Sequence, residues 1–132
     1  MIPSKEDILH AMHEERAESY LIYAEKIQVG GCILLIDKNS NCNILDFLFI
    51  NKGMEGKNLG VKIWHAIENK YPQTKRWMTI TPHFEVHNIH FYINKCQFKA
   101  VEFAHPHYLS STRPIHPILK DEYYFYFEKE MQ

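Results

Sequence analysis

The chain has 132 residues, of which 45% are hydrophobic and 23% are charged, and its formal net charge is −1. This length and composition predict a single globular domain over residues 1–132 that can bury its own core. A nearly neutral chain lacks the strongly basic surface that nucleic-acid binding usually needs, so we expect neither DNA nor RNA as a partner.

The cysteines and the first residues bear on where the protein works. Cys32, Cys42 and Cys96 are odd in number and follow no zinc or redox spacing, which favours a reducing, cytoplasmic location without disulfides. The first residues form no apolar signal segment, and no apolar run reaches membrane-spanning length. We therefore expect no membrane association.

The first part of the chain predicts one helix and two strands. Ser4 and Asp7 have capping-box spacing ahead of an apolar helical face, which predicts a helix over residues 4–18. Rising β-branched and aromatic content then predicts strands over 20–27 and 29–37.

A hairpin is expected next. The pair Gly30-Gly31 indicates a turn or bulge between the two strands just named. Residues 38–41 are typical of a turn, and the strongly apolar run 42–50 predicts a strand that pairs antiparallel with 29–37.

The second half alternates helices with strands. Leu59, Ile63 and Ile67 recur at i, i+4 and i+8, which predicts a helix of about four turns that ends before Pro72. The remaining expected elements are a strand over 76–81, a helix over 84–95, a strand over 99–103, a loop over 105–119 and a strand over 122–129. This order predicts an α/β protein with a mixed sheet and crossover helices.

The segment from Ile50 to Trp64 is the most informative one. An apolar strand runs into a loop with three glycines, and an amphipathic helix begins at once. Exposed backbone N–H groups at the start of a helix form a natural anion site, and phosphate is a common ligand there. The alternative is an ordinary strand-to-helix turn in which glycine serves geometry alone.

Two stretches of the chain resemble one known family. Glu55-Gly56-Lys57-Asn58-Leu59-Gly60 resembles the acetyl-CoA-binding motif of the GCN5-related N-acetyltransferases, which has a Gln or Arg, two residues, a Gly, one residue, and a Gly or Ala. The segment 88–98 is similar to the second CoA-binding helix of that family and the strand after it. The resemblance covers roughly residues 28–104 and 122–130, and it implies a mixed, mostly antiparallel central sheet with flanking helices.

This chain departs from the family pattern at three positions. Glu55 stands in place of the leading Gln or Arg, Asn58 in place of the first motif glycine, and Gln97 in place of a late glycine. Asn tolerates positive φ better than other residues with a side chain, so we expect Asn58 to adopt that conformation if the loop requires it. The N-terminal region is also short, with one helix where many members have two.

The resemblance implies a binding site for acetyl-CoA as co-substrate. The backbone amides of residues 56–61 would hold its pyrophosphate at the positive end of the helix dipole. The residues expected to contact the cofactor are Leu48, Phe49, Ile50, Glu55, Gly56, Lys57, Asn58, Leu59, Gly60, Val61, Asn88 and Tyr92.

Acetyl transfer to an amine needs a donor for the oxyanion and an acid for the departing thiolate. The resemblance implies that backbone N–H groups of residues 48–50 supply the first. It also places a tyrosine of the second helix near the sulfur, which makes Tyr92 the candidate acid. The alternative is that Tyr92 is one more core aromatic in a chain with 8 tyrosines.

The amine also needs a base. Asp46 is the only carboxylate inside the strand 42–50 and is our candidate catalytic base. It lies two residues beyond the strand glutamate that some family members use, which places it on the same face of a regular strand. A water chain without a dedicated side chain is an equal alternative, and His83 and Glu85 are further candidates.

Three histidines suggest a separate hypothesis. His83, His87 and His90 fall at i, i+4 and i+7, and histidines at i and i+4 on a helix can share a metal ion. No carboxylate or cysteine is placed to complete the ligand set, and His83 directly follows Pro82 at the expected helix start. We therefore expect surface or acceptor-site histidines and no metal.

The sequence thus predicts an acetyl-CoA-dependent N-acetyltransferase that acts on the primary amine of a small molecule or peptide by direct attack on the thioester. One alternative is a CoA-binding module of the same fold with weak turnover or none. A metal-dependent protein built on the histidine face is the other. A homodimer formed through the C-terminal strand is compatible with this organisation.

Overall fold

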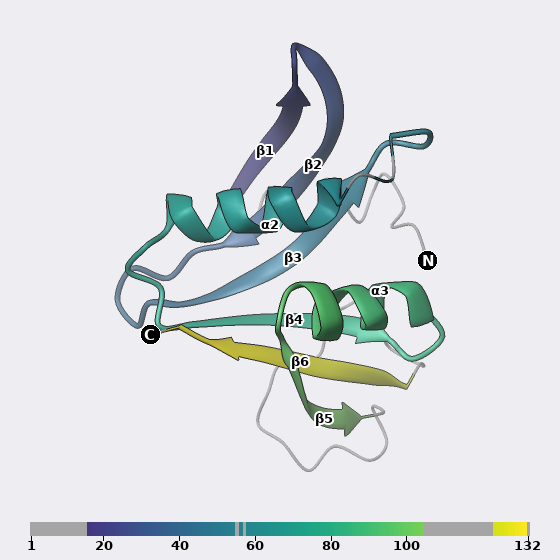
Figure 1. Ribbon diagram of the computed structural model, residues 1–132. Helices are drawn as coiled ribbons and strands as arrows, with labels where there is room; N and C mark the ends of the chain where they lie inside the picture. Colours follow the sequence, from purple (N-terminus) through teal and green to yellow (C-terminus); the bar gives the residue numbers. More distant parts are fainter. Residues whose placement is uncertain (1–15, 55, 57, 105–122, 132) are drawn as a thin grey trace.

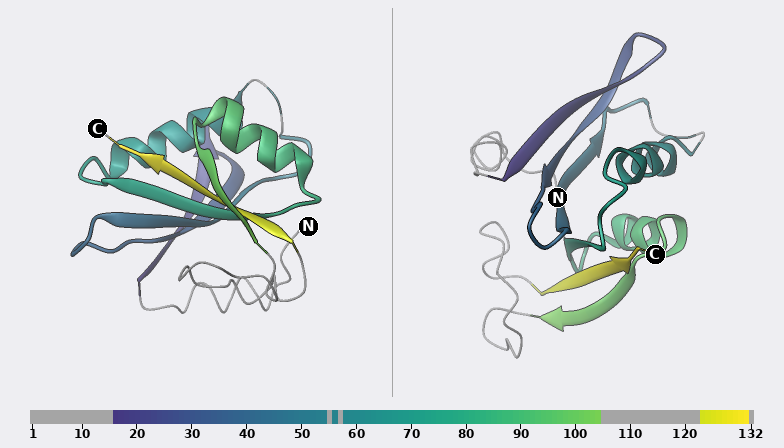
Figure 2. Two further views of the ribbon diagram at one scale, coloured as in Figure 1. Left: turned by 90° about the horizontal axis from the view of Figure 1, so that it is seen from below. Right: turned by 90° about the vertical axis from the view of Figure 1, so that its left-hand side faces the viewer.

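The computed structural model describes residues 16–54, 56, 58–104 and 123–131. They form one six-stranded sheet in the order β1-β2-β3-β4-β6-β5, in which only β3 and β4 pair in parallel. The elements are β1 (Ala17–Ala24), β2 (Ile27–Leu35), β3 (Cys42–Ile50), α2 (Leu59–Lys70), β4 (Arg76–Pro82), α3 (Val86–His90), the π-helix η1 (Phe91–Lys95), β5 (Lys99–Ala104) and β6 (Tyr124–Glu130). Figure 1 labels them, and Figure 2 shows both helices on one face of the sheet. The expected mixed, mostly antiparallel sheet is confirmed.

The start of the chain differs from the expected helix over 4–18. Residues 4–15 lie outside the described part of the chain, but Ala17 and Glu18 are the first residues of β1 and pair with Leu35 and Leu34 of β2. The helical reading of these two residues is therefore wrong. Cross-strand pairing with an apolar partner strand outweighs their intrinsic helix preference.

The turn between the first two strands also differs from the expectation. It lies at Glu25 and Lys26, which both have positive φ (51° and 69°), the backbone shape that tight hairpins prefer. Gly30 and Gly31 instead lie inside β2, one residue after a bulge at Val29. A Cβ on Gly30 would lie 2.1 Å from the carbonyl oxygen of Phe49, so glycine is needed there for close approach of two strands.

The helix α2 covers the middle of the sheet. It buries Ile63, Trp64 and Ile67, and the Trp64 ring lies 5.2 Å from the rings of both Trp77 on β4 and Phe98. Large aromatic side chains buried in this way contribute most of the apolar contact in a core of this size. The expected helix, with its i, i+4, i+8 apolar face and its end before Pro72, is confirmed.

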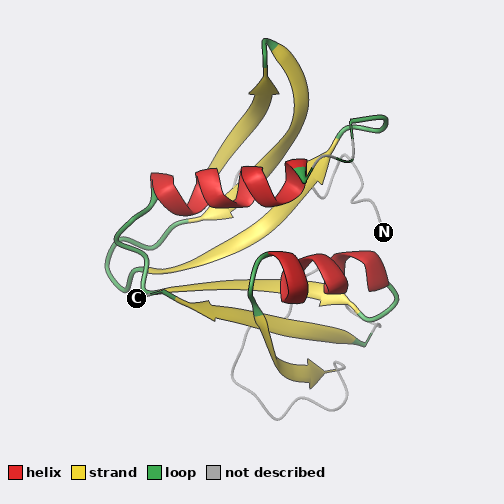
Figure 3. Ribbon diagram, in the orientation of Figure 1, coloured by secondary structure: helices red, strands yellow, loops and turns green. Residues whose placement is uncertain are grey.

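The parallel strands β3 and β4 separate soon after they meet. Their ladder joins only residues 42–44 to residues 76–78, and the Thr79 hydroxyl then donates a hydrogen bond to the Leu45 carbonyl over 2.9 Å. Beyond this point the two strands diverge, as Figure 3 shows in the region below α2. The divergence opens the sheet in front of the N-terminus of α2.

A bulge in β3 accompanies the divergence. Leu45 pairs with Leu34 and Phe47 pairs with Ile33, so Asp46 is an extra residue between two consecutive pairs. Leu45 and Leu48 both pack into the core on the helix side although they are three residues apart. The alternation of side chains therefore changes phase at Asp46.

The expected helix over 84–95 consists of two parts. The short α3 continues directly into η1, where the Cys96 amide donates to the Phe91 carbonyl over 3.0 Å in the wider π spacing. Gln97 follows with a φ of 68°, at the position where the related family usually has glycine. The expected loop over 105–119 lies outside the described residues, and among the helices that are described none is both long and apolar enough to cross a membrane.

Candidate functional site

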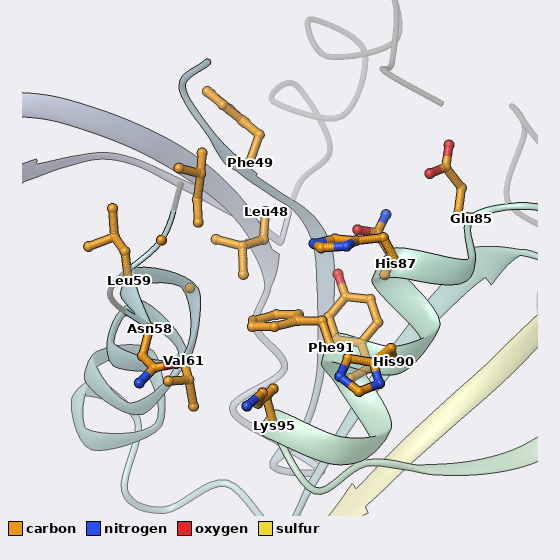
Figure 4. Close-up of a pocket in the computed structure, with 15 residues that line it drawn as sticks. Leu48, Phe49, Asn58, Leu59, Val61, Glu85, His87, His90, Phe91 and Lys95 are labelled. Atoms are coloured by element: carbon orange, nitrogen blue, oxygen red, sulfur yellow. The ribbon is translucent and has the colours of Figure 1, made fainter. Parts of the chain in front are cut away.

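A cavity of about 580 Å³ lies where β3 and β4 diverge. Its lining comes from the end of β3, the N-terminus of α2, and the continuous helix formed by α3 and η1. The lining residues are Leu48, Phe49, Ile50, Gly56, Asn58, Leu59, Gly60, Val61, Glu85, His87, Asn88, His90, Phe91, Tyr92 and Lys95. Figure 4 shows Asn58, Leu59 and Val61 on one side of the cavity and His90, Phe91 and Lys95 on the other.

The N-terminus of α2 presents free backbone donors to this cavity. Asn58 caps the helix in the left-handed conformation with a φ of 58°, which asparagine tolerates better than other residues with a side chain, and Gly56 has a φ of 108°. The first α-helical bond runs from the Lys62 amide to the Asn58 carbonyl over 3.1 Å. The amides of Gly60 and Val61 therefore precede the helical hydrogen-bond pattern and can bind another acceptor.

Gly60 has a second role in packing. A Cβ at this position would lie 2.9 Å from the Phe91 ring and 3.4 Å from Ile50 Cδ1. Glycine therefore lets the aromatic ring of η1 approach the start of α2. A side chain at position 60 would enter the cavity or displace the Phe91 ring.

The β3 wall is mostly apolar and depends on β2. Ile50 pairs with Gly30 and Phe49 pairs with Gly31, so the two glycines lie directly behind the cavity wall. Phe49 is 41% exposed, and a Cβ on Gly31 would lie 2.8 Å from its ring and 3.0 Å from the Tyr20 carbonyl oxygen, so glycine at position 31 leaves room for the ring.

Tyr92 belongs to both the cavity and the core. It lines the cavity, yet it is only 8% exposed and its ring packs against Phe98 and Phe127. Burial raises the pKa of Tyr92 to about 12, and a hydrogen bond with Thr79 partly opposes that shift. The phenol therefore keeps its proton throughout the neutral pH range.

Asp46 does not line the cavity. The parity argument that placed it on the working face assumed a regular strand, and the bulge at Asp46 breaks that regularity. Its assignment as a base stays a prediction without support from the cavity. Glu55 and Lys57 lie outside the described residues, and Lys62 lines a separate apolar pocket between α2 and the β1–β2 hairpin.

The histidines do not form one helical face. His83 precedes α3 and packs against the rings of Phe84 and Tyr123, whereas His87 and His90 line the cavity. Within the ranges that the structure describes, no three His, Cys, Asp or Glu side chains are grouped to hold a metal ion.

Sequence reasoning did not assign His87, His90, Phe91 or Lys95 to the cofactor cavity. The available signal was helical spacing. Residues at i, i+3 and i+4 lie on one side of a helix, so His90 and Phe91 are expected on the same side as His87.

Comparisons with known proteins agree with this architecture. No family model matches the chain. The chain is 36% identical over 139 aligned residues to the uncharacterized protein YrkN of Bacillus subtilis. The alignment covers 99% of this chain and 74% of YrkN.

Solved structures share the fold at low identity. A Bacillus subtilis acetyltransferase in complex with CoA matches with a TM-score of 0.73 and 16% identity, over 97% of this chain and 85% of that one. A GNAT family acetyltransferase from Elizabethkingia anophelis with acetyl-CoA bound has a TM-score of 0.74 and 15% identity, over 98% and 84%. The chain therefore has the fold of the GCN5-related N-acetyltransferases.

Few residues are identical between this chain and these structures. The sequence resemblance is therefore confined to the two short segments 55–60 and 88–98. The Escherichia coli ribosomal-protein-S18-alanine N-acetyltransferase has a TM-score of 0.73 at 10% identity, over 98% of this chain and 78% of that one. The fold is thus shared while most side chains differ. YrkN belongs to the same sequence group as the present chain.

Proposed function

We propose that this protein is an acetyl-CoA-dependent N-acetyltransferase that acetylates a primary amine by direct attack on the thioester. The observation that carries the proposal is the single cavity that joins the free amides of α2 to the opening between β3 and β4. Four solved structures with this fold contain CoA or acetyl-CoA.

The residues present fit a CoA diphosphate. The amides of Gly60 and Val61 and the positive end of the α2 dipole would bind its oxygens. Lys95 and His90 line the opposite side of the cavity and add cationic or hydrogen-bonding groups. The mostly apolar β3 wall suits the less polar arm of the cofactor.

The chemistry assigns two further roles. Backbone N–H groups of residues 48–50, on the part of β3 that β4 no longer pairs with, would donate to the oxyanion that forms on the thioester carbonyl. Tyr92 would give its proton to the departing sulfur, because its raised pKa keeps it protonated. Asp46 remains a candidate base from the sequence alone.

The acceptor is a primary amine of a small molecule or peptide. Two proteins with this fold act on ribosomal proteins, one on S18 alanine and one on the N-terminal serine of L7/L12, which supports an amine acceptor without choosing one. We further propose a cytoplasmic location and a homodimer as the assembly to test.

The test combines binding with turnover. Isothermal titration with acetyl-CoA should give saturable binding, and thiol release should depend on an amine drawn from lysine, spermidine, an aminoglycoside, and peptides that begin with alanine or serine. Binding without amine-dependent thiol release from any of these would favour the alternative, a CoA-binding module. Absence of acetyl-CoA binding would contradict the proposal as a whole.

A further inference from the structure

We infer that His87 is the general base of this site, the group that takes the proton from the attacking amine. The inference rests on the proposed acetyl transfer and names a residue for a step that the sequence assigned to Asp46. The geometry that carries it is the position of His87 on the cavity wall, together with Tyr92 and the end of β3.

The cavity limits the choice of base to a few side chains. A base must lie within hydrogen-bond reach of the amine, directly or through one water molecule. Among the lining residues only Glu85, His87 and His90 can accept a proton, since Lys95 is a cation and the other lining side chains are apolar, amide or phenol groups. Asp46 is outside this set.

His90 is engaged elsewhere. One of its ring nitrogens, Nδ1, lies 2.8 Å from Asn94 Nδ2. Figure 4 shows the His90 ring on the same side of the cavity as Phe91 and Lys95, below the His87 ring in this view. This is the side on which the diphosphate would bind, away from the reacting carbonyl.

Glu85 is placed less well than His87. It precedes α3, and Figure 4 shows its carboxylate directed away from the other labelled side chains. In the same view the His87 ring projects from α3 toward the Leu48 side of the cavity. Leu48 belongs to the β3 segment whose backbone would bind the oxyanion.

His87 is also exposed and available. Within the described part of the chain it forms no hydrogen bond or ion pair, so both ring nitrogens can exchange protons with water or substrate. Histidine is the side chain suited to gain and lose a proton near neutral pH.

The spacing of His87 and Tyr92 suits a base and an acid in one reaction. His87 lies in α3 and Tyr92 lies five residues further along in η1, and both side chains line the cavity. The reacting carbon would lie between the two groups, each of which needs about 3 Å to its own partner atom. The base would meet the amine on one side and the acid would meet the sulfur on the other.

The charged and titratable groups near His87 are few. Its own helix carries His90 and the preceding Glu85, η1 carries Tyr92 and Lys95, and His83 stands before the helix. Cys42 and Asp46 are the titratable groups of β3, and the described lining residues of β3 and α2 are uncharged.

The proton balance closes without a further reactant. An imidazole nitrogen of His87 takes a proton from the amine as the new N–C bond forms, and the C–S bond then breaks. Tyr92 donates its proton to the sulfur and recovers one from water, while His87 releases its proton to water. The products are the acetylated amine and free CoA thiol.

The experiment measures kcat and KM of the His87→Gln and His87→Ala variants across pH 5.5 to 9, with the amine that the wild type accepts best. We expect kcat to fall by about 10²-fold, the typical range of general base catalysis, while KM for acetyl-CoA changes less than about twofold. The acid limb of the kcat profile should disappear, and added imidazole should partly restore kcat in His87→Ala.

The control is His65→Gln, a change on the exposed side of α2 that leaves the cavity intact, and it should retain wild-type kcat. A His87→Gln variant with wild-type kcat and an unchanged pH profile would overturn the inference. So would an equal loss in Asp46→Asn with none in His87→Gln. Failure of the wild type to bind acetyl-CoA would instead overturn the proposed function, so the two failures are distinguishable.

Discussion

The two walls of the cavity are built in different ways, and glycine serves each of them differently. On the α2 wall, Gly56 has a φ of 108° and open space where a Cβ would lie, so glycine is there for backbone conformation. On the β3 wall, Gly30 lies in a strand, and a Cβ there would meet the Phe49 carbonyl oxygen at 2.1 Å. Here glycine is needed for space.

This difference decides what a sequence can reveal. A positive φ is a local property, and glycine or asparagine next to a helix start indicates it directly. The close approach of β2 and β3 involves Gly30 and Phe49, which are far apart in the chain, so the glycines of β2 look like a turn until the sheet is known.

The largest expected effect is on the β3 wall. Gly30→Ala should lower the free energy of unfolding by about 3 kcal/mol, since the contact is with backbone that cannot rotate away. Urea unfolding followed by circular dichroism measures it. Gly53→Ala is the matched control, because Gly53 has a φ of 89° with nothing within 4 Å, and it should cost about 1–2 kcal/mol from backbone strain. Equal losses in the two variants would break the comparison.

A companion pair sharpens the same point. A Cβ on Gly31 would meet the Phe49 ring at 2.8 Å, and a side chain can be removed. Phe49→Ala should therefore recover part of the loss in Gly31→Ala and none of the loss in Gly30→Ala, as a double-mutant cycle measures.

Tyr92→Phe tests whether the Tyr92 phenol, which lines the cavity between the two walls, takes part in the reaction. We expect kcat to fall by about 10²-fold with little change in KM, because the phenol proton is removed while the ring packing is kept. Assays of thiol release at varied substrate concentration measure kcat and KM. If the variant keeps full activity, Tyr92 serves the core alone.

Gly60→Glu tests the α2 wall. KM for acetyl-CoA should rise at least about tenfold, since the new side chain would enter the cavity and repel phosphate at close range. Ala66→Glu adds the same charge to α2 on the side away from this cavity and should leave KM near its wild-type value. A similar rise of KM in both variants would mean that the added charge raises KM wherever it lies on α2, and would contradict the placement of acetyl-CoA beside Gly60.

Asn58 tests the local conformation of the same wall. Asn58→Ala should lower the free energy of unfolding by about 1 kcal/mol, because alanine is disfavoured at a φ of 58°, whereas Asn58→Gly should be close to neutral. Thermal unfolding of the two variants side by side would show the difference, and equal stabilities would remove conformation as the reason for Asn58.

The smallest expected effect concerns pH and the strand behind the β3 wall. Burial raises the pKa of the Cys32 thiol to about 11, and Cys32 pairs with Leu48. The folded state thus keeps this proton at a pH where the unfolded chain loses it, so the stabilisation is complete below about pH 8.5 and declines as pH rises toward 11. Urea unfolding at pH 8 and pH 10 should show lower stability at pH 10, and Cys32→Ala should reduce that difference.

Local patterns carried much of the prediction. The bounds of β3 at 42–50 and the apolar face and end of α2 follow from the sequence, because hydrophobic periodicity and a following proline act within one segment. The expected helix over 84–95 is found as α3 and η1, which together begin at Val86 and end at Lys95, but the π-helical form of its second half was not predicted.

The sequence by itself determined the order of the main elements and indicated that Asn58 could adopt a positive φ, because each depends on neighbouring residues. Only the tertiary structure decided that Gly30 and Gly31 support the cavity wall, that the bulge removes Asp46 from the strand alternation, and that His87 and Lys95 line the cavity. These features arise where strands or helices distant in the chain meet, and no single segment encodes them.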